Sequence, residues 1–232
     1  NKNSINGILT SSGKEIYSNK VILTTGTFLN GMIHIGDKRT PAGRYNEKPT
    51  VGLSEQLQKY YFKIGRLKTG TPPRLDGRTI NYSNLDEQHP DDEVSFFSFF
   101  TKKNINKQIS CGITYTNEKV HELISKNIKQ SAMYSGSIKG VGPRYCPSIE
   151  DKIYKFKNKT RHQIFLEPEG LEDKTVYPNG ISTSLPADLQ QEICNNINGL
   201  ENVNILRPGY AIEYDYVDPR ELFLTLETKK IK

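Results

Sequence analysis

Val21-Ile22-Leu23-Thr24-Thr25-Gly26-Thr27 is the stretch of this sequence that bears most directly on the fold. Aliphatic side chains that run into Thr-Thr-Gly are typical of a buried strand that ends at a turn. A continuous apolar run, in contrast to an alternating one, favours a parallel sheet that is covered on both faces. The stretch therefore predicts an α/β fold with a buried strand over residues 21–27.

Three amphipathic stripes predict helices that would cover such a sheet. Their apolar side chains recur at helical spacing, in the groups Leu53, Leu57, Tyr60 and Tyr61; Val120, Leu123, Ile124 and Ile128; and Leu189, Ile193 and Ile197. Thr116 or Asn117 is expected to cap the second helix. Pro186 and Gly199 bracket the third, as expected for the two ends of a helix. We interpret all three stripes as faces of the core.

Further strands and one irregular insertion complete the expected organisation. Strands are predicted at residues 5–9, 16–17, 163–167, 203–207, 211–216 and 222–227. Between Lys68 and Gln108 the chain is rich in Pro, Asn, Asp and Gly, with Phe96-Phe97-Ser98-Phe99-Phe100 expected to pack the segment down. A long stretch without periodicity is more often functional than idle. The sequence predicts an α/β fold with an inserted subdomain.

Composition argues against several classes of protein. Of the 232 residues, 34% are hydrophobic, which is too many for a disordered chain, and no apolar run approaches the ~18 residues of a spanning helix. Three widely spaced cysteines do not suit a disulfide framework, and four scattered histidines do not suggest a metal site. The 32 Lys and Arg against 26 Asp and Glu give a net charge of +6, which permits a polyanionic partner without requiring one.

Cys146 is the residue with the most suggestive surroundings. It lies in Gly140-Val141-Gly142-Pro143-Arg144-Tyr145-Cys146-Pro147-Ser148-Ile149-Glu150-Asp151-Lys152. Pro147 suits the first position of a helix, which would make Cys146 the N-cap. Free backbone N–H groups and the nearby Arg144 would lower the pKa of the thiol and favour a nucleophilic thiolate. A buried, inert cysteine is the alternative, and the spacing does not decide between the two.

Four cations on a Pro-kinked segment suggest a contact with phosphate groups. They are Arg66, Lys68, Arg74 and Arg78, around Gly70-x-Pro72-Pro73. Closely spaced cations on a stiff segment suit nucleic-acid binding, whereas a solvated loop is the ordinary alternative. The residues alone thus predict an activated cysteine beside an anion-binding turn on a basic α/β scaffold.

Several long motifs resemble the MnmG (GidA) family of flavoproteins, which modify the wobble uridine of tRNA. They cover nearly the whole chain and are Val21–Leu29, His34–Gly36, Gly65–Arg74, Gly140–Lys152, His162–Gly170, Tyr177–Pro186 and Arg207–Asp215. The chain has no initiator Met and lacks the glycine-rich dinucleotide loop that opens the family's fold. The resemblance therefore implies an internal fragment, which alone is expected to be inactive.

The resemblance implies an FAD-binding, doubly wound fold of the two-dinucleotide flavoprotein type. Residues 1–65 would be part of the FAD-binding domain, residues 66–150 an inserted subdomain with a segment facing NAD and tRNA, and residues 151–232 the return to the FAD-binding domain. FAD and NADH would be the redox cofactors, methylenetetrahydrofolate the one-carbon donor, and glycine or ammonium the amine. The expected partners are tRNA, the GTPase MnmE and a second copy in a homodimer, in the cytoplasm or an organelle and not at a membrane.

The resemblance also carries site residues onto this sequence. Cys146 matches one of two cysteines implicated in catalysis. A thiolate would activate uracil C5 by adding at C6, and the resemblance leaves open whether Cys146 makes this attack or carries the methylene group. Thr50 aligns with a position that contacts FAD. The segment expected to bind NAD consists of Gly142, Pro143, Arg144, Tyr145, Cys146, Pro147, Ser148, Ile149, Glu150, Asp151, Lys152, Ile153, Tyr154, Lys155 and Phe156.

Two other functions compete with this interpretation. One is a related folate- and FAD-dependent tRNA uridine methyltransferase of the TrmFO type, whose motifs differ between Arg144 and Lys152. The other is a non-catalytic RNA-binding module that uses the basic loops alone. An activated Cys146 would distinguish the enzymes from the module, because a binding module has no use for a nucleophilic thiol.

Overall fold

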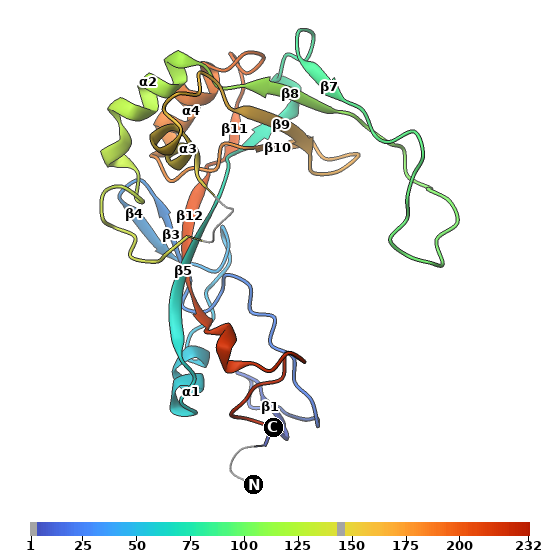
Figure 1. Ribbon diagram of the computed structural model, residues 1–232, viewed down its shortest axis with the longest axis vertical. Coiled ribbons are helices and arrows are strands. Elements are labelled where there is room, and N and C mark those ends of the chain that lie inside the picture. The colour runs from blue at the N-terminus through green and yellow to red at the C-terminus, as the bar shows by residue number, and fades with distance from the viewer. Residues whose placement is uncertain (1–3, 143–146) are drawn as a thin grey trace.

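A computed structural model describes residues 4–142 and 147–232. Its described strands form three sheets (Figure 1). A two-stranded hairpin joins β1 (Gly7–Leu9) and β2 (Glu15–Tyr17). A four-stranded sheet has the order β4-β3-β12-β5, from β3 (Met32–Ile35), β4 (Lys38–Pro41), β5 (Ile64–Thr71) and β12 (Tyr210–Val217).

The largest sheet has six strands in the order β11-β6-β10-β9-β8-β7. Its strands are β6 (Arg74–Asp76), β7 (Asp86–Gln88), β8 (Cys111–Tyr115), β9 (Gln163–Pro168), β10 (Thr175–Asn179) and β11 (Ile205–Arg207). Every ladder between the described strands of the three sheets is antiparallel. The α/β class is confirmed, while the doubly wound arrangement stays a proposal.

Three helices gather beside the six-stranded sheet and enclose the main core (Figure 1). They are α2 (Glu118–Lys126), α3 (Ile149–Lys155) and α4 (Ala187–Asn195), and each turns an apolar stripe inward. Val120 and Ile124 from α2, Ile149 from α3 and Ile193 from α4 meet Leu75, Ile164, Leu166 and Leu185 in one buried cluster. This core fixes where α3 lies, and α3 carries part of the predicted site.

The helix predictions are confirmed in position. The Asn117 side chain caps α2 by accepting a hydrogen bond from the Val120 N–H at 3.0 Å. Pro186 precedes α4, and Gly199 beyond it has the positive φ of 80° that glycine adopts without strain. Helix α1 (Leu53–Lys59) forms around the first stripe but ends before Tyr60.

Two of the predicted strands are wrong. Residues 21–27 form no strand, and Ile22 is 85% exposed. An apolar run becomes a buried parallel strand only beside a partner, and the described chain offers residues 21–27 no adjacent parallel strand. Residues 222–227 form a tight turn instead of a strand, in which Leu226 adopts a φ of 65° and its N–H donates to the Phe223 carbonyl.

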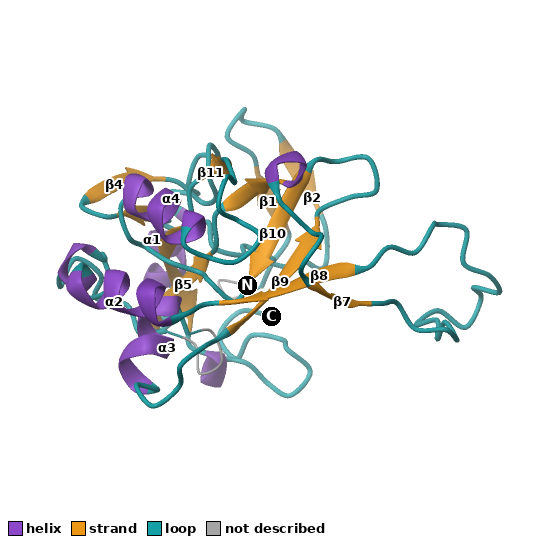
Figure 2. Cartoon of the chain, turned by 90° about the horizontal axis from the view of Figure 1, so that it is seen from above, coloured by secondary structure: helices purple, strands orange, loops and turns teal. Residues whose placement is uncertain are grey.

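The predicted insertion is more regular than its composition indicates. The end of β5, strands β6 and β7 and a short 3-10 turn at Gly77–Thr79 lie within residues 68–88, and the longest irregular part is the loop over residues 89–110 between β7 and β8. This loop projects far from the body of the molecule (Figure 2). Phe97, Phe99 and Phe100 are each more than 90% exposed. The prediction that these rings pack the segment down is wrong, because the loop has no core beneath it.

The two long strands β5 and β12 connect the helical end of the molecule to the end where both termini lie (Figure 1). They pair over their whole lengths, from Tyr210 opposite Thr71 to Val217 opposite Ile64. The four-stranded sheet thus takes strands from all three expected segments of the chain, and the division at residues 65 and 150 stays a prediction. No helix in the described part of the chain is long and apolar enough to cross a membrane.

Candidate functional site

Helix α3 begins at Ile149, and a capping box closes its first turn. The Ser148 hydroxyl accepts a hydrogen bond from the Asp151 N–H at 3.1 Å, and the Asp151 carboxylate accepts one from the Ser148 N–H at 3.4 Å. The expected N-cap at Cys146 is wrong, because Ser-x-x-Asp satisfies the free backbone donors two residues later. Cys146 lies outside the described residues, as do Pro143, Arg144 and Tyr145.

Glu150, the second residue of α3, anchors the helix in the core. Its side chain is fully buried, and Oε1 accepts three hydrogen bonds. The donors are the Ser131 hydroxyl at 2.9 Å, the Thr183 hydroxyl at 3.0 Å and the Ser184 N–H at 3.0 Å. Oε2 is buried without a hydrogen-bond partner among the described residues. These contacts tie α3 to two separate loops and fix the direction in which its next residue, Asp151, points.

A cavity of about 340 Å³ lies between α3 and strand β5. We refer to it as the Lys68–Asp151 cavity. Its walls combine cations, a carboxylate, aromatic rings and apolar side chains, from Lys68, Met133, Tyr134, Ile138, Gly140, Asp151, Tyr154 and Lys155. The Tyr134 and Tyr154 rings are tilted by 58° with their centroids 5.7 Å apart. The cavity therefore offers both positive charge and flat apolar surface.

Asp151 is the electrostatic centre of this cavity. Its Oδ2 lies 3.6 Å from Lys68 Nζ, and its Oδ1 lies 3.3 Å from Lys155 Nζ and accepts a hydrogen bond from the Tyr134 hydroxyl at 3.0 Å. Burial alone would raise the pKa of Asp151, but Lys68, Tyr134 and Lys155 together hold it below its usual value. Burial and the neighbouring Asp151 raise the pKa of Tyr134. At neutral pH, Asp151 is charged and Tyr134 is a hydrogen-bond donor.

Lys68 passes close to the segment that leads towards Cys146. The Lys68 side chain is only 13% exposed, and Nζ lies 3.3 Å from the Met133 sulfur. A Cβ atom at Gly142 would lie 2.9 Å from Cε of Lys68, so the glycine leaves room for the lysine side chain. The two predicted features, the cationic segment and the glycine-containing turn, therefore meet at this point.

Glu213 on β12 fastens the residues before Gly142. Its Oε1 accepts hydrogen bonds from the backbone N–H groups of Lys139 at 3.0 Å and Gly140 at 2.9 Å, while Oε2 lies 3.0 Å from Nε2 of the buried His34. Burial alone would raise the pKa of Glu213, but the bonds from Gly140 and Lys139, together with His34 and Arg66, lower the pKa. The Lys68 N–H also donates to the Val141 carbonyl at 3.1 Å. One wall of the cavity is thereby fixed to the four-stranded sheet.

The other three predicted cations each lie against a carboxylate. Arg66 donates to Asp215 at 2.8 Å and to the Asn30 carbonyl. Arg74 on the six-stranded sheet pairs with Glu169 and stacks over the Tyr177 ring at 4.3 Å. Arg78 pairs with Asp76 at 2.7 Å but leaves two thirds of its own side chain exposed. The structure thus separates the four cations into two on β5 and two at β6, and their role in nucleic-acid binding stays a prediction.

The described residues of the predicted NAD segment divide between core and surface. Ile149, Glu150 and Ile153 are buried. Asp151, Tyr154 and Lys155 line the Lys68–Asp151 cavity. The residues that can meet a ligand are therefore those on one side of α3.

Thr50, the predicted FAD contact, lies elsewhere on the molecule. It forms an isolated bridge with Leu29, and its backbone exchanges hydrogen bonds with Phe28 and Asn30. The residue is exposed, so a ligand can reach it.

Sequence reasoning missed Tyr134 and Glu213 as parts of the site. Glu213 carried a signal, because a carboxylate directly after Ala211 and Ile212 in a predicted strand is expected to need a buried partner. Tyr134 lies between elements and no pattern marks it.

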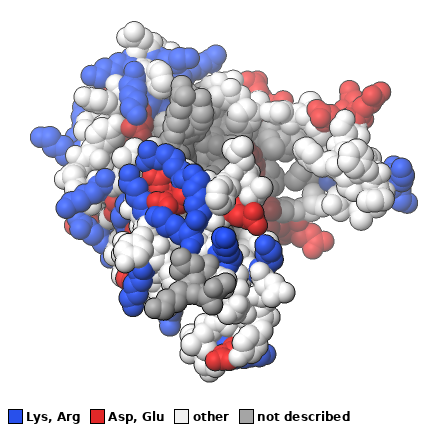
Figure 3. Space-filling model, turned by 60° about the horizontal axis from the view of Figure 1, so that its bottom comes forward, with Lys and Arg blue, Asp and Glu red and all other residues white. Residues whose placement is uncertain are grey.

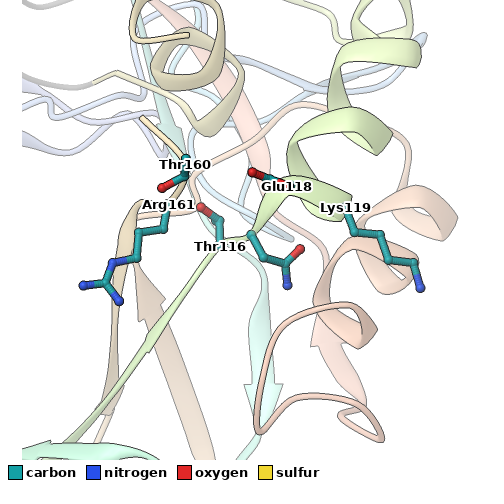
Figure 4. Close-up of a pocket in the computed structure, with 6 residues that line it drawn as sticks. Thr116, Glu118, Lys119, Thr160 and Arg161 are labelled. Atoms are coloured by element: carbon teal, nitrogen blue, oxygen red, sulfur yellow. The ribbon is translucent and has the colours of Figure 1, made fainter. Parts of the chain in front are cut away.

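A second cavity, of about 450 Å³, lies at the start of α2 (Figure 4). It is lined by Thr116, Asn117, Glu118, Lys119, Thr160 and Arg161. None of the predicted site residues is among them. Thr116 and Asn117 have structural roles here, since Thr116 accepts from the His162 N–H and Asn117 caps the helix. Among the described residues there is no cluster of His, Cys, Asp and Glu that could hold a metal ion.

Comparisons with known proteins give consistent results. The family model described as "Glucose inhibited division protein A" matches residues 1–232. A protein of Thermodesulfovibrio yellowstonii, named tRNA uridine 5-carboxymethylaminomethyl modification enzyme MnmG, is 57% identical over 228 residues, and the enzyme of the same name in Geobacter sulfurreducens is 54% identical. Each match covers 98% of this chain and 36% of the relative, so the chain spans about a third of its curated relatives.

Solved structures of GidA resemble the chain about as closely as these relatives do. The structure of Aquifex aeolicus GidA in one crystal form has a TM-score of 0.90 and 53% sequence identity, and covers 100% of this chain and 39% of that one. A second crystal form of the same protein gives a TM-score of 0.88.

Proposed function

The chain belongs to the glucose inhibited division protein A family, and we propose that the protein containing it is an enzyme that modifies the wobble uridine of tRNA. The product would carry a carboxymethylaminomethyl or aminomethyl group at C5 of the base. The observation that carries this proposal is the identity of 57% and 54%, over 98% of the chain, to relatives named for this modification. We place the activity in the cytoplasm or in an organelle.

The Lys68–Asp151 cavity supports NADH as a cofactor. NADH combines an anionic pyrophosphate with planar rings, and the cavity supplies Lys68 and Lys155 for the charge and Tyr134 and Tyr154 for the rings. When bound, NADH supplies a hydride. The residues present fit the group, and Asp151 would hold the two lysines in place instead of contacting the anion itself.

FAD is proposed for the whole protein on the strength of the family. In the described part of the chain, the exposed Thr50 is the residue that we assign to it. A doubly wound FAD-binding fold would also give the exposed apolar stretch at residues 21–27 a parallel sheet to join. We therefore propose that residues 1–65 and 151–232 contribute to the FAD-binding domain.

Cys146 is proposed as the nucleophile. Its thiolate would form a bond to C6 of uracil, which places the electron pair at C5 for attack on an electrophilic carbon. The bond to sulfur breaks again when the proton at C5 is removed. Methylenetetrahydrofolate is the proposed source of the carbon, and glycine or ammonium the source of the amine. The two bonds from this carbon to folate nitrogens break and tetrahydrofolate leaves, as the bonds to C5 and to the amine nitrogen form. MnmE and a second copy of the protein are the proposed partners.

The direct test is a reconstituted reaction. The full-length protein and MnmE are incubated with unmodified tRNA, NADH, methylenetetrahydrofolate, GTP and glycine, and the tRNA nucleosides are analysed by mass spectrometry. The proposal expects the mass of a carboxymethylaminomethyl group on one uridine, and the smaller aminomethyl group when ammonium replaces glycine. A single added methyl group would show a uridine methyltransferase instead.

A further inference from the structure

The loop between β7 and β8, residues 89–110, forms an arm that extends from the edge of the six-stranded sheet (Figures 1 and 2). Strand β7 is the outermost strand and pairs with β8 alone. The arm therefore leaves the body at a free edge of the six-stranded sheet.

The tip of the arm carries an unusual concentration of exposed aromatic rings. Phe97 is 106% exposed, Phe99 is 95% exposed and Phe100 is 92% exposed. Ile105 on the returning side is 83% exposed. A cluster of rings that buries nothing in its own chain marks a surface for a partner. Their exposure means that both faces of each ring can be reached.

The charges of the arm are separated along its length. Asp91, Asp92 and Glu93 lie in its first part, whereas residues 94–110 contain no acidic residue and include Lys102, Lys103 and Lys107. Figure 3 shows this projection as a largely white surface between red and blue patches. The exposed rings are thus followed directly by cations, with no carboxylate among them.

We propose that residues 94–107 of the arm bind a single-stranded loop of RNA, with bases stacked on the phenylalanine rings and phosphates against the lysines. Proteins that bind single strands without reading sequence combine these two elements. The lysines that follow the rings favour a polyanionic partner over a purely apolar one. The inference rests on the proposed function and adds a substrate contact remote from the Lys68–Asp151 cavity.

The test compares RNA binding by full-length variants. In one variant, Phe97→Ala, Phe99→Ala and Phe100→Ala are combined, and in a second, Lys102→Gln, Lys103→Gln and Lys107→Gln. Leu171→Ala is the matched control, because Leu171 is 54% exposed in the loop between β9 and β10 of the same sheet. The probes are a short RNA hairpin with a single-stranded loop and a fully paired RNA duplex. Sedimentation and thermal unfolding are measured for each protein.

The proposal expects the phenylalanine variant to bind the hairpin at least about tenfold more weakly, with unchanged duplex binding and thermal midpoint. The lysine variant should bind more weakly and with a smaller salt dependence. If the wild type and both variants bind the hairpin with equal affinity, the proposed role of the arm is wrong, while the proposed function of the protein is not affected.

Two further results would also overturn it. If a variant becomes a monomer where the wild type is a dimer, and its RNA affinity is unchanged, the arm contacts a second copy of the chain instead of RNA. A lower thermal midpoint with normal RNA affinity in the lysine variant would assign it to packing within the protein. If the wild-type protein binds no RNA at all, the proposed function fails together with the arm.

Discussion

The Nζ atom of Lys68 lies 3.6 Å from Oδ2 of Asp151, and 13% of each side chain is exposed. Lys68 belongs to a strand of the four-stranded sheet, and Asp151 belongs to the helix that packs beside the six-stranded sheet. The pair therefore joins the two halves of the fold at the wall of the candidate site. It also brings together two features that the sequence places far apart, a basic segment and a helix start.

Replacing the carboxylate should cost more stability here than at an ordinary surface pair. Asp151→Asn keeps a capping oxygen but leaves Lys68 and Lys155 without their anion, and we expect a loss of about 2 kcal/mol in the free energy of unfolding. Glu122→Gln, which breaks an exposed pair with Lys126, should cost about 0.5 kcal/mol or less. Urea denaturation of both variants measures the difference. Equal losses would show that the Asp151 pairs contribute no more than a surface contact.

Acid should weaken the protein below about pH 6.5, the pKa of histidine in an unfolded chain. Burial lowers the pKa of His34 against the opposing effect of Glu213, and burial also lowers the pKa values of His121 and His162. Between their pKa values in the folded state and about 6.5, the unfolded chain binds more protons, so stability is full above this range and falls as the pH decreases through it.

His34→Gln should make this pH dependence less steep. Urea midpoints measured between about pH 7 and pH 5 report the effect, because this interval includes the ordinary pKa of histidine. The matched control is His89→Gln, whose side chain is 73% exposed. Slopes that are the same for wild type and His34→Gln would contradict the burial of a neutral imidazole.

The three cysteines should react with iodoacetamide at very different rates. Burial raises the pKa of Cys194 to about 12, and burial together with Glu167 raises the pKa of Cys111. A thiolate is the reacting form, so both should be slow near neutral pH, with Cys194 the slower because it is 1% exposed. Cys146, beside Arg144, is predicted to react first. Peptide mass spectrometry gives the order of reaction, and the differences in rate should disappear when the protein is labelled in urea. A slow reaction of Cys146 in the folded protein would refute its activation.

The NADH assignment predicts a local effect of one lysine. Lys155→Gln should weaken NADH binding by about 3- to 10-fold, because one charge-assisted contact to the pyrophosphate is lost. The neighbouring exposed Lys159, which does not line the cavity, serves as the control in Lys159→Gln. Fluorescence titration of NADH with the full-length variants measures both. An identical NADH affinity for the two variants would show that the Lys68–Asp151 cavity does not bind NADH.

Helices with strong local signals could be predicted from the sequence. Asn117 in front of an apolar stripe and Pro186 and Gly199 around another identify α2 and α4, because capping and periodicity are local properties. The sequence predicts the start of α3 two residues too early because two local rules compete there, proline at the first position and Ser-x-x-Asp as a capping box. The observed box at Ser148 satisfies more backbone donors.

Features that depend on distant residues could not be predicted. The sequence predicts burial for residues 21–27 and for the phenylalanines of the arm because they are apolar. Burial, however, needs a surface to pack against. The cavity itself depends on the register of β5 beside β12 and on the buried Glu150 that positions α3. The sequence therefore identified Lys68, Asp151 and Lys155 as candidates, and only the tertiary structure brings them together.

The most direct measurement of the central claim separates two activities of the full-length protein carrying Cys146→Ser. Serine has a similar volume, but its hydroxyl stays protonated at neutral pH, so it cannot replace a thiolate. We predict that tRNA modification, followed by nucleoside mass spectrometry, falls to background while NADH oxidation continues at the wild-type rate. Modification at the wild-type rate would contradict the account, because the activated cysteine would then have no part in the reaction.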